Sequence, residues 1–358
     1  ASLRYDDISA TADKINGGDI DKGGSDTTYK INTLWNATEK VALRASYGTG
    51  FKAPSMRQIG EPLSDFGVTS GSFPCPFAAG DARRSTCKPG ENQVNVFRRG
   101  SADLTFETSK QYSVGLVLTP TDQLDITVDY WSIELDDIVD RATEQQIFSN
   151  PALYDDLFTV KPNLATGRDE LAIIQGAINV ASSEQAGIDW ATNYAGIDLG
   201  FGTLDLKLGG TYMNKQDNSL YGSSLGQFGS DDAVVFRNVM NLGATLYHGN
   251  FTHTLFTNYR SGYRDQEVGV EITGTGAPLG AGPKTDIQLK VDAYATTNYQ
   301  LRYLHGDNLN LGFGIKNLFD EAPNLSLRES GAGHQVGWDP RYTDAYGRTF
   351  YASASFSF

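Results

Sequence analysis

The sequence lacks the long apolar runs of a helical membrane protein. No stretch approaches the roughly 18 consecutive apolar residues that cross a bilayer as a helix. Met is scarce (3), whereas Gly (39), Tyr (18) and Phe (18) are abundant. This composition favours strands and turns over helices. A transmembrane β-barrel also has such a composition, because only every second residue of its strands meets lipid.

An excess of positive charge is also missing. The chain carries 29 Lys and Arg against 43 Asp and Glu, a formal net charge of −14. A nucleic-acid partner would require a basic surface, so we expect none. The first residues, ASLRYDDIS, contain no basic region followed by an apolar run and read as part of a strand. We therefore expect a mature protein that begins inside a larger one.

Catalytic motifs are absent as well. The sequence contains no GxSxG, HExxH or P-loop pattern, and nothing singles out a Ser/His/Asp grouping of the phospholipase kind. The four histidines, His248, His253, His305 and His334, are scattered. Two of them, His248 and His305, lie in expected tight turns. The sequence therefore predicts a protein that is not an enzyme.

One acidic segment, DIDKGGSD at 19–26, is distantly similar to a calcium loop. Gly23 occupies a ligand position and Lys30 stands where a bidentate Glu belongs, so an EF-hand is excluded. Looser calcium binding is one interpretation and a solvated acidic loop is the other; the acidic residues concerned are Asp19, Asp21 and Asp26, or Asp231 and Asp232. No other metal site or cofactor is expected.

Only two cysteines are present, and both lie in one polar segment, FPCPFAAGDARRSTC. Cys75 and Cys87 form no CxxC pair and have no histidine nearby, which disfavours a metal or redox site. We predict a disulfide bond between them. Such a bond implies an oxidising compartment outside the cytoplasm.

Apolar and polar residues alternate from end to end. In the final segment, GRTFYASASFSF, Phe350, Ala352, Ala354 and Phe356 fall on one side and Thr349, Tyr351 and the serines on the other. The alternation predicts twelve strands, at about 1–9, 27–37, 40–51, 108–119, 123–138, 173–194, 203–216, 234–248, 251–264, 287–304, 308–317 and 346–358. Acidic side chains on the polar side, such as Asp125 and Asp129, require that this side meet water or a polar partner.

Tight and long connections alternate along this series. The long ones cover about 10–26, 52–107, 139–172, 217–233, 265–286 and 318–345. Short turns at one rim and long loops at the other are typical of an outer-membrane barrel. We expect little regular structure in 52–107 and one or two helical turns after an N-cap at Thr143 in 139–172.

Three segments resemble the TonB-dependent outer-membrane receptors. LRASYGTGFKAPSMRQI is similar to that family's Phe-Arg-Ala-Pro-Ser motif, through Phe51, Ala53, Pro54 and Ser55. GSADLTFETSKQYSVGL resembles a second conserved segment through Asp103, Leu104, Glu107 and Thr108. GIKNLFDEAPN resembles a third; its matching residues are Asn317, Leu318, Phe319 and Asp320. The last strand, ending at Phe358, resembles the family's C-terminal strand.

The resemblance implies an all-β fold: a transmembrane antiparallel barrel of 22 strands, of which residues 1–358 supply about the last twelve. The family's N-terminal plug, with its TonB-binding segment, would then be absent from this chain, and a companion polypeptide would complete the wall. The C-terminus would be periplasmic and the long loops extracellular. Aromatic residues near the strand ends, such as Trp35, Tyr130 and Tyr212, would form the membrane-interface girdle.

The resemblance also implies a function. It indicates active uptake of a scarce nutrient across the bacterial outer membrane, powered by TonB through the missing part, with ferric siderophore as the default cargo. Saccharide, peptide, haem or cobalamin remain open as cargo. The expected partners are outer-membrane lipid and lipopolysaccharide, the plug and a small-molecule cargo. A passive porin-like barrel and a surface interaction or adhesion barrel are the alternatives.

Loop residues are the candidates for cargo binding. They are Arg57, Gln58, Phe66, Arg83, Arg84, Arg98, Arg99, Trp338, Arg341 and Tyr342. The four arginines at 83, 84, 98 and 99 are unusual in an acidic protein and suit a carboxylate or an anionic iron chelate. The alternative is that they pair with Asp81, Glu91 and Asp103 or contact lipid phosphates.

Overall fold

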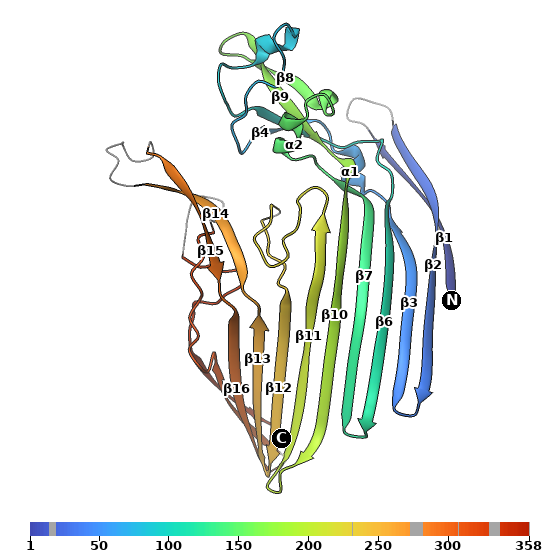
Figure 1. Cartoon of the computed structure of the whole chain (residues 1–358), viewed down its shortest axis with the longest axis vertical. Helices are drawn as coiled ribbons and strands as arrows, with labels where there is room; N and C mark the ends of the chain where they lie inside the picture. Colours follow the sequence, from blue (N-terminus) through green and yellow to red (C-terminus); the bar gives the residue numbers. More distant parts are fainter. Residues whose placement is uncertain (14–18, 231, 273–281, 307, 329–336, 358) are drawn as a thin grey trace.

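A computed structural model describes residues 1–13, 19–230, 232–272, 282–306, 308–328 and 337–357. Within these ranges, twelve strands form one antiparallel sheet in which each strand pairs with the next one in the series (Figure 1). The strands are β1 (Ser2–Asp13), β2 (Asp19–Thr38), β3 (Val41–Lys52), β6 (Glu107–Thr121), β7 (Leu124–Asp140), β10 (Ile178–Asp198), β11 (Thr203–Asn218), β12 (Asn238–His248), β13 (Phe251–Arg260), β16 (Tyr294–His305), β17 (Leu309–Lys316) and β18 (Thr349–Phe356). The predicted set of twelve is confirmed. Phe358, with which the predicted last strand ends, lies outside the described residues.

Pairing register places like residues on one face. Phe313 lies opposite Ala352, and Leu311 opposite Ala354, so the apolar rows of β17 and β18 coincide. The same face continues onto β16, where Leu301 pairs with Phe313. Because directly opposed residues of an antiparallel pair share a face, the alternation in the sequence becomes two different surfaces of one sheet.

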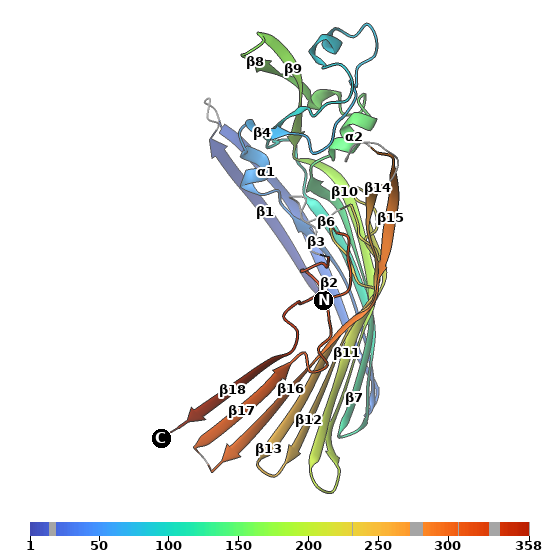
Figure 2. The ribbon, with the colours of Figure 1, turned by 90° about the vertical axis from the view of Figure 1, so that its left-hand side faces the viewer.

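The sheet is curved, and the connection from β17 to β18 lies on its concave side (Figure 2). The opposite, convex face is apolar and uncovered: Phe350 and Phe356 are each 60% exposed and Phe313 is 41% exposed. A surface of this extent with large exposed apolar side chains requires an apolar partner. In the described part of the chain, none of the helices has the length and apolar character needed to cross a membrane.

The concave face is polar and internally paired. Arg44 on β3 donates two hydrogen bonds, of 2.6 and 2.5 Å, to the Asp129 carboxylate on β7. The pair reaches across β6 at Gly115, where a Cβ atom would lie 1.9 Å from Asp129 Oδ1, so a larger residue there would displace the Asp129 side chain. The acidic side chains are therefore on the wetted face, as the alternation predicted.

The long loops at 52–107 and 139–172 form a folded outer subdomain instead of the irregular segment that we expected for 52–107. It contains α1 (Met56–Gly60), β4 (Ser64–Val68), η1 (Ala82–Thr86), β5 (Asn95–Arg99), α2 (Glu144–Ser149), η2 (Asp155–Leu157), β8 (Phe158–Asn163) and β9 (Arg168–Gly176). Its four-stranded sheet runs in the order β4-β5-β9-β8, and β5 and β9 are parallel. Val96, Ile147 and Ile173 form its core and are at most 1% exposed. The expectation was wrong because neither loop buries an apolar face alone, whereas the two together do.

The predicted N-cap is confirmed: Thr143 accepts a hydrogen bond from the Gln146 N–H.

Two further expectations about loops are corrected. The segment expected as loop 10–26 is largely strand, since β1 and β2 pair as far as Asp13 and Asp19. Much of 265–286 extends as a hairpin of β14 (Tyr263–Glu271) and β15 (Lys284–Val291). The expected strands 251–264 and 287–304 are therefore each broken in two. The break lets Tyr263 and Val291 turn into a small buried cluster with Val234.

The predicted disulfide is confirmed between Cys75 and Cys87, whose Cα atoms are 5.7 Å apart. Both cysteines pack against the core of the outer subdomain. The bond closes a short loop, because the two residues are 12 positions apart. It thereby removes conformational freedom from the unfolded segment.

We expect Cys75→Ala with Cys87→Ala to destabilise the outer subdomain by about 3 kcal/mol, the value for closure of a loop of this size. Hydrogen exchange should rise in β5 and β9 and stay unchanged in β7 and β10. Equal exchange in β5 and β9 with and without the bond would show that the apolar core alone holds the subdomain.

Candidate functional site

The connection between β17 and β18 folds back onto the concave face, and a sharp turn starts it. Asn317 is buried with φ of 50°. Its side chain donates to the Glu321 carbonyl and accepts from the Glu321 N–H, both at 2.8 Å. Asp320, with φ of 60°, accepts a hydrogen bond of 2.8 Å from the Arg348 N–H at the far end of the loop. Two of the four residues of the third motif thus close this loop; Leu318 is half-buried and Phe319 is 71% exposed.

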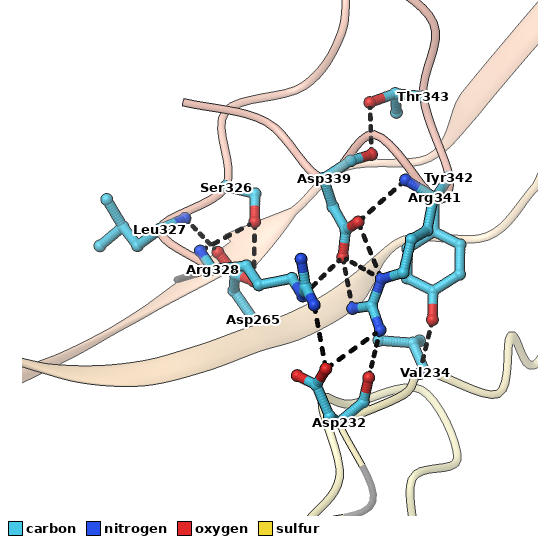
Figure 3. Close-up of polar contacts among 10 residues, drawn as sticks. All are labelled: Asp232, Val234, Asp265, Ser326, Leu327, Arg328, Asp339, Arg341, Tyr342 and Thr343. Carbon is cyan, nitrogen blue, oxygen red and sulfur yellow. Dashed lines mark hydrogen bonds and ion pairs between the residues drawn. The ribbon is translucent and has the colours of Figure 1, made fainter. Parts of the chain in front are cut away.

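A buried carboxylate holds the middle of this loop (Figure 3). The side chain of Asp339 is 1% exposed and receives Arg341 Nη2 at 2.7 Å and Nε at 3.0 Å. Arg328 Nε lies 3.6 Å from the same carboxylate, and its Nη2 lies 2.9 Å from Asp232. Burial alone would raise the pKa of the Asp339 carboxyl, but the hydrogen bonds from Arg341 outweigh burial and hold that pKa below its ordinary value.

A second buried carboxylate fastens the start of the loop to the β14–β15 hairpin. Asp265 is fully buried and accepts the Ser326 hydroxyl at 3.0 Å and the Leu327 N–H at 2.6 Å. It therefore satisfies two donors that would otherwise be buried without partners. Burial also raises the pKa of the neighbouring Tyr263 hydroxyl, which stays neutral.

Tyr342 joins this network to the sheet. Its hydroxyl accepts the Val234 N–H at 2.9 Å, and its ring meets Phe236 edge-on at 4.9 Å between centroids. Arg260, at the end of β13, donates to its carbonyl at 2.7 Å. Residues 232–237, 326–328 and 337–343 and strands β14 and β15 are therefore connected into one unit over the concave face.

A hollow of about 1200 Å³ lies between this unit and the sheet. Its wall carries aromatic rings of Tyr294, Trp338 and Tyr346, and the amides of Asn241 and Asn258. Arg260, Arg341 and Lys316 add positive charge. Aromatic faces with a few convergent polar groups are typical of a site for a small molecule. We call it the lumen hollow.

A second polar site lies at the outer ends of β3 and β7, where the first motif leads into α1. Pro54 is buried, and Ser55 caps α1 by accepting the Gln58 N–H at 3.3 Å. The helix presents Arg57 and Glu61, whose side chains are 3.1 Å apart. Arg141, just after β7, lies 3.1 Å from the same Glu61 carboxylate. The guanidinium of Arg98 stacks on the Phe66 ring, 3.2 Å from its centroid.

The expected group of four arginines is divided by the structure. Arg83 pairs with Asp81 at 2.9 Å and with Asp155 at 2.7 Å, and Arg84 donates to the Phe77 carbonyl at 2.5 Å. These two hold the outer subdomain together, while Arg99 is exposed on β5. In the described part of the chain, no hydrogen bond or ion pair joins the side chains of Arg83, Arg84 or Arg99 to that of Arg98. Trp338, Arg341 and Tyr342 do meet, at the lumen hollow.

Sequence reasoning missed the residues that organise both sites. They are Glu61, Arg141, Arg260, Asp265, Arg328 and Asp339. Their only sequence signal is a charged residue at a strand end or in a loop, which many other positions share.

The calcium candidates differ in what the structure describes of them. Asp26 accepts the Thr27 N–H at 2.6 Å, and Asp232 is paired with Arg328. Asp231 and the side chains of Asp19 and Asp21 lie outside the described residues. Loop-bound calcium stays a prediction.

A curved antiparallel sheet with an apolar convex face, a polar concave face and long loops at one rim defines a β-barrel wall. The chain belongs to the TonB dependent receptor-like β-barrel family, whose family model matches residues 1–318. No curated protein sequence matches it.

Solved structures with the same fold are known. The siderophore receptor PirA from Acinetobacter baumannii is 16% identical with a TM-score of 0.63, and the match covers 99% of this chain and 43% of PirA. A mutant of the ferric enterobactin receptor PfeA from Pseudomonas aeruginosa is 20% identical with a TM-score of 0.62, and the match covers 95% of this chain and 42% of PfeA. The copper transporter OprC is 14% identical with a TM-score of 0.53, and the match covers 99% of this chain and 45% of OprC. The chain thus spans less than half the length of each.

We expect Asp339→Asn to loosen the loop, because a neutral amide pairs less well with two guanidiniums. Hydrogen bonds to charged groups contribute about 1.5–3 kcal/mol, so tryptic cleavage after Arg341 should accelerate about tenfold. Asp344→Asn is the matched control, since that exposed carboxylate accepts only the nearby Tyr346 N–H in the described contacts. Equal cleavage in both variants would contradict the role of Asp339.

The same carboxylate predicts a pH dependence. A lowered folded-state pKa means that the stabilisation is present above the ordinary Asp value of about 3.9 and is lost as pH falls below it. Oxidative footprinting of Trp338 and Tyr342 should therefore increase between pH 5 and pH 3. Asp339→Asn should show high labelling at both values; a parent protein with constant labelling would argue against the assignment.

Proposed function

We propose that this chain forms barrel wall and cargo-binding loops of an outer-membrane transporter that takes up a scarce nutrient with energy delivered through TonB. The observation that carries the proposal is the lumen hollow. It is a small-molecule-sized site on the polar face of a barrel wall, under a loop that buried ion pairs hold in place. Ferric siderophore is the default cargo, and the structural similarity to the siderophore receptor PirA and to the ferric enterobactin receptor PfeA supports this class.

In this proposal the convex face meets lipid and the loop-bearing rim faces the outside of the cell. The strand ends joined by tight turns, including the C-terminal end, face the periplasm. The plug and the TonB-binding segment belong to the part of the receptor outside residues 1–358. The chain's own residues bind and orient cargo, and no bond is made or broken.

The proposed function is tested by uptake measurements in cells. A strain that lacks the gene should grow poorly under iron limitation and normally under sugar limitation, and ⁵⁵Fe uptake should return with the gene but not in a strain lacking TonB. Trp338→Ala should reduce the restored uptake, because it removes an aromatic wall of the hollow, whereas Trp35→Ala on the convex face should not. Uptake that continues without TonB would favour a passive porin. Loss of cell attachment with unchanged uptake would favour an adhesion barrel.

The membrane placement has a separate test. Leu311→Lys places a charge on the convex face, where it should cost about 2–4 kcal/mol in lipid. Asn310→Lys, on the neighbouring position of the same strand, places the charge on the concave face and should be tolerated. Insertion into outer membranes and heat-modifiable gel mobility report the difference. Equal insertion of the two variants would show that the convex face does not meet lipid.

A further inference from the structure

Two guanidiniums at the barrel mouth share one carboxylate, and a third guanidinium, that of Arg98, interacts electrostatically with all three groups. Arg57 and Arg141 each lie 3.1 Å from Glu61, and the side chain of Arg98 stands among them without an ion pair in the described part of the chain. Three positive charges therefore face one negative charge. We propose that Arg57, Arg98 and Arg141 form an oxyanion-binding site, and that the cargo is a chelate carrying carboxylate or phosphate groups with at least two negative charges. We call it the arginine site; the proposal of a cargo rests on the proposed function.

The unpaired hydrogen-bond donors are the first support. Arg98 Nε and Arg141 Nε are both buried and, among the described residues, have no acceptor. A buried donor without a partner costs about 1–3 kcal/mol, more when it is charged, so such groups normally have an acceptor. Two of them in one cluster indicate that an acceptor belongs there.

The local electrostatics agree. Burial lowers the pKa of the Arg98 guanidinium, and repulsion from Arg141 lowers it further. The hydrogen bond from Arg57 holds the pKa of the Glu61 carboxyl below its ordinary value, so Glu61 stays ionised. Two carboxylates at the adjoining ends of β7 and β6 have other side-chain partners: Asp140 accepts the Tyr221 hydroxyl at 3.0 Å, and Glu107 pairs with Lys52 at 3.0 Å.

The site is also built rigidly. The Gly100 N–H donates to the Glu61 carbonyl, and the Ser101 N–H donates to the Gln58 carbonyl, both at 2.8 Å. Gly100 lies so close that a Cβ atom there would be 2.6 Å from the Ile59 carbonyl oxygen. The end of β5 is therefore fastened directly onto α1. With its face on Phe66, Arg98 keeps the edge of its guanidinium for an in-plane acceptor.

These features select among the possible cargoes. A fixed guanidinium fork matches the two oxygens of a carboxylate or phosphate, often in a bidentate arrangement. A neutral hydroxamate chelate or a saccharide would leave the excess charge uncompensated. The arginine site therefore favours an anionic chelate and discriminates by charge, whereas the lumen hollow provides the aromatic and amide wall.

The test uses the receptor as its gene encodes it, purified from outer membranes and titrated calorimetrically with three probes. These are iron(III) citrate, pyrophosphate and an uncharged iron(III) trihydroxamate. We expect both polyanions to bind and Arg98→Gln to weaken each about tenfold or more, the effect of losing a charge-assisted hydrogen bond. Arg98→Lys should retain only part of the parent's affinity for the polyanions, because an ammonium group lacks the planar fork of a guanidinium. Arg168→Gln, an exposed arginine on β9, is the matched control.

The parent protein gives a second measurement that depends on no variant. Raising the salt concentration from 0.05 to 0.5 M should weaken polyanion binding and leave the uncharged chelate unaffected. The inference is overturned if neither polyanion binds, if both bind Arg98→Gln as tightly as the parent, or if the uncharged chelate loses as much affinity as the polyanions. TonB-dependent uptake is measured separately, so uptake of an uncharged chelate would refute the arginine site and leave the proposed function standing.

Discussion

The wall formed by this chain depends on backbone pairing between adjacent strands whose side chains alternate with a period of two residues. Each strand of the large sheet hydrogen-bonds to its neighbours in chain order, and this satisfies the backbone without a helix. Because the alternation is kept in register, the sheet has one apolar and one polar face. A shift of one position in β17 would move Leu311 and Phe313 to the polar face and Asn310 to the apolar one. Register is therefore the constraint that fixes the two faces of the wall.

The loops are ordered by a different means. Two buried carboxylates organise them: Asp265 on β14 accepts hydrogen bonds from Ser326 and Leu327, and Asp339 holds Arg341 and Arg328. A buried carboxylate without partners would be costly, so each one holds its donors in place. The outer subdomain instead uses an apolar core and a disulfide. Buried carboxylates thus organise the loops above β12 to β18, while an apolar core, a disulfide and the pairing of Arg83 organise those above β3 to β10.

The two proposed binding regions differ in chemistry in a way that suits successive contacts with one ligand. The arginine site at the mouth presents excess positive charge from a rigid helix and strand end. The lumen hollow presents aromatic rings and amides, and one of its cations, Arg341, is already paired with Asp339. Long-range attraction falls off slowly with distance compared with ring contacts, so charge suits capture and shape suits retention.

The sequence by itself determined the sheet. The alternation of apolar and polar residues predicted the twelve strands, and the order of tight and long connections predicted which strand ends carry the long loops. Two cysteines in one polar segment predicted the disulfide. Each of these signals is a property of neighbouring residues. The sequence missed the outer subdomain, since β5 and β9 pair in parallel although they are far apart in the sequence, with Asn95 opposite Ala172. It also grouped four arginines that the structure separates: Arg83 pairs with Asp81 and Asp155, whereas Arg98 interacts with Arg141. Only the tertiary structure decided these partners, because charge has no periodicity in sequence and a guanidinium pairs with whichever carboxylate the fold brings within reach.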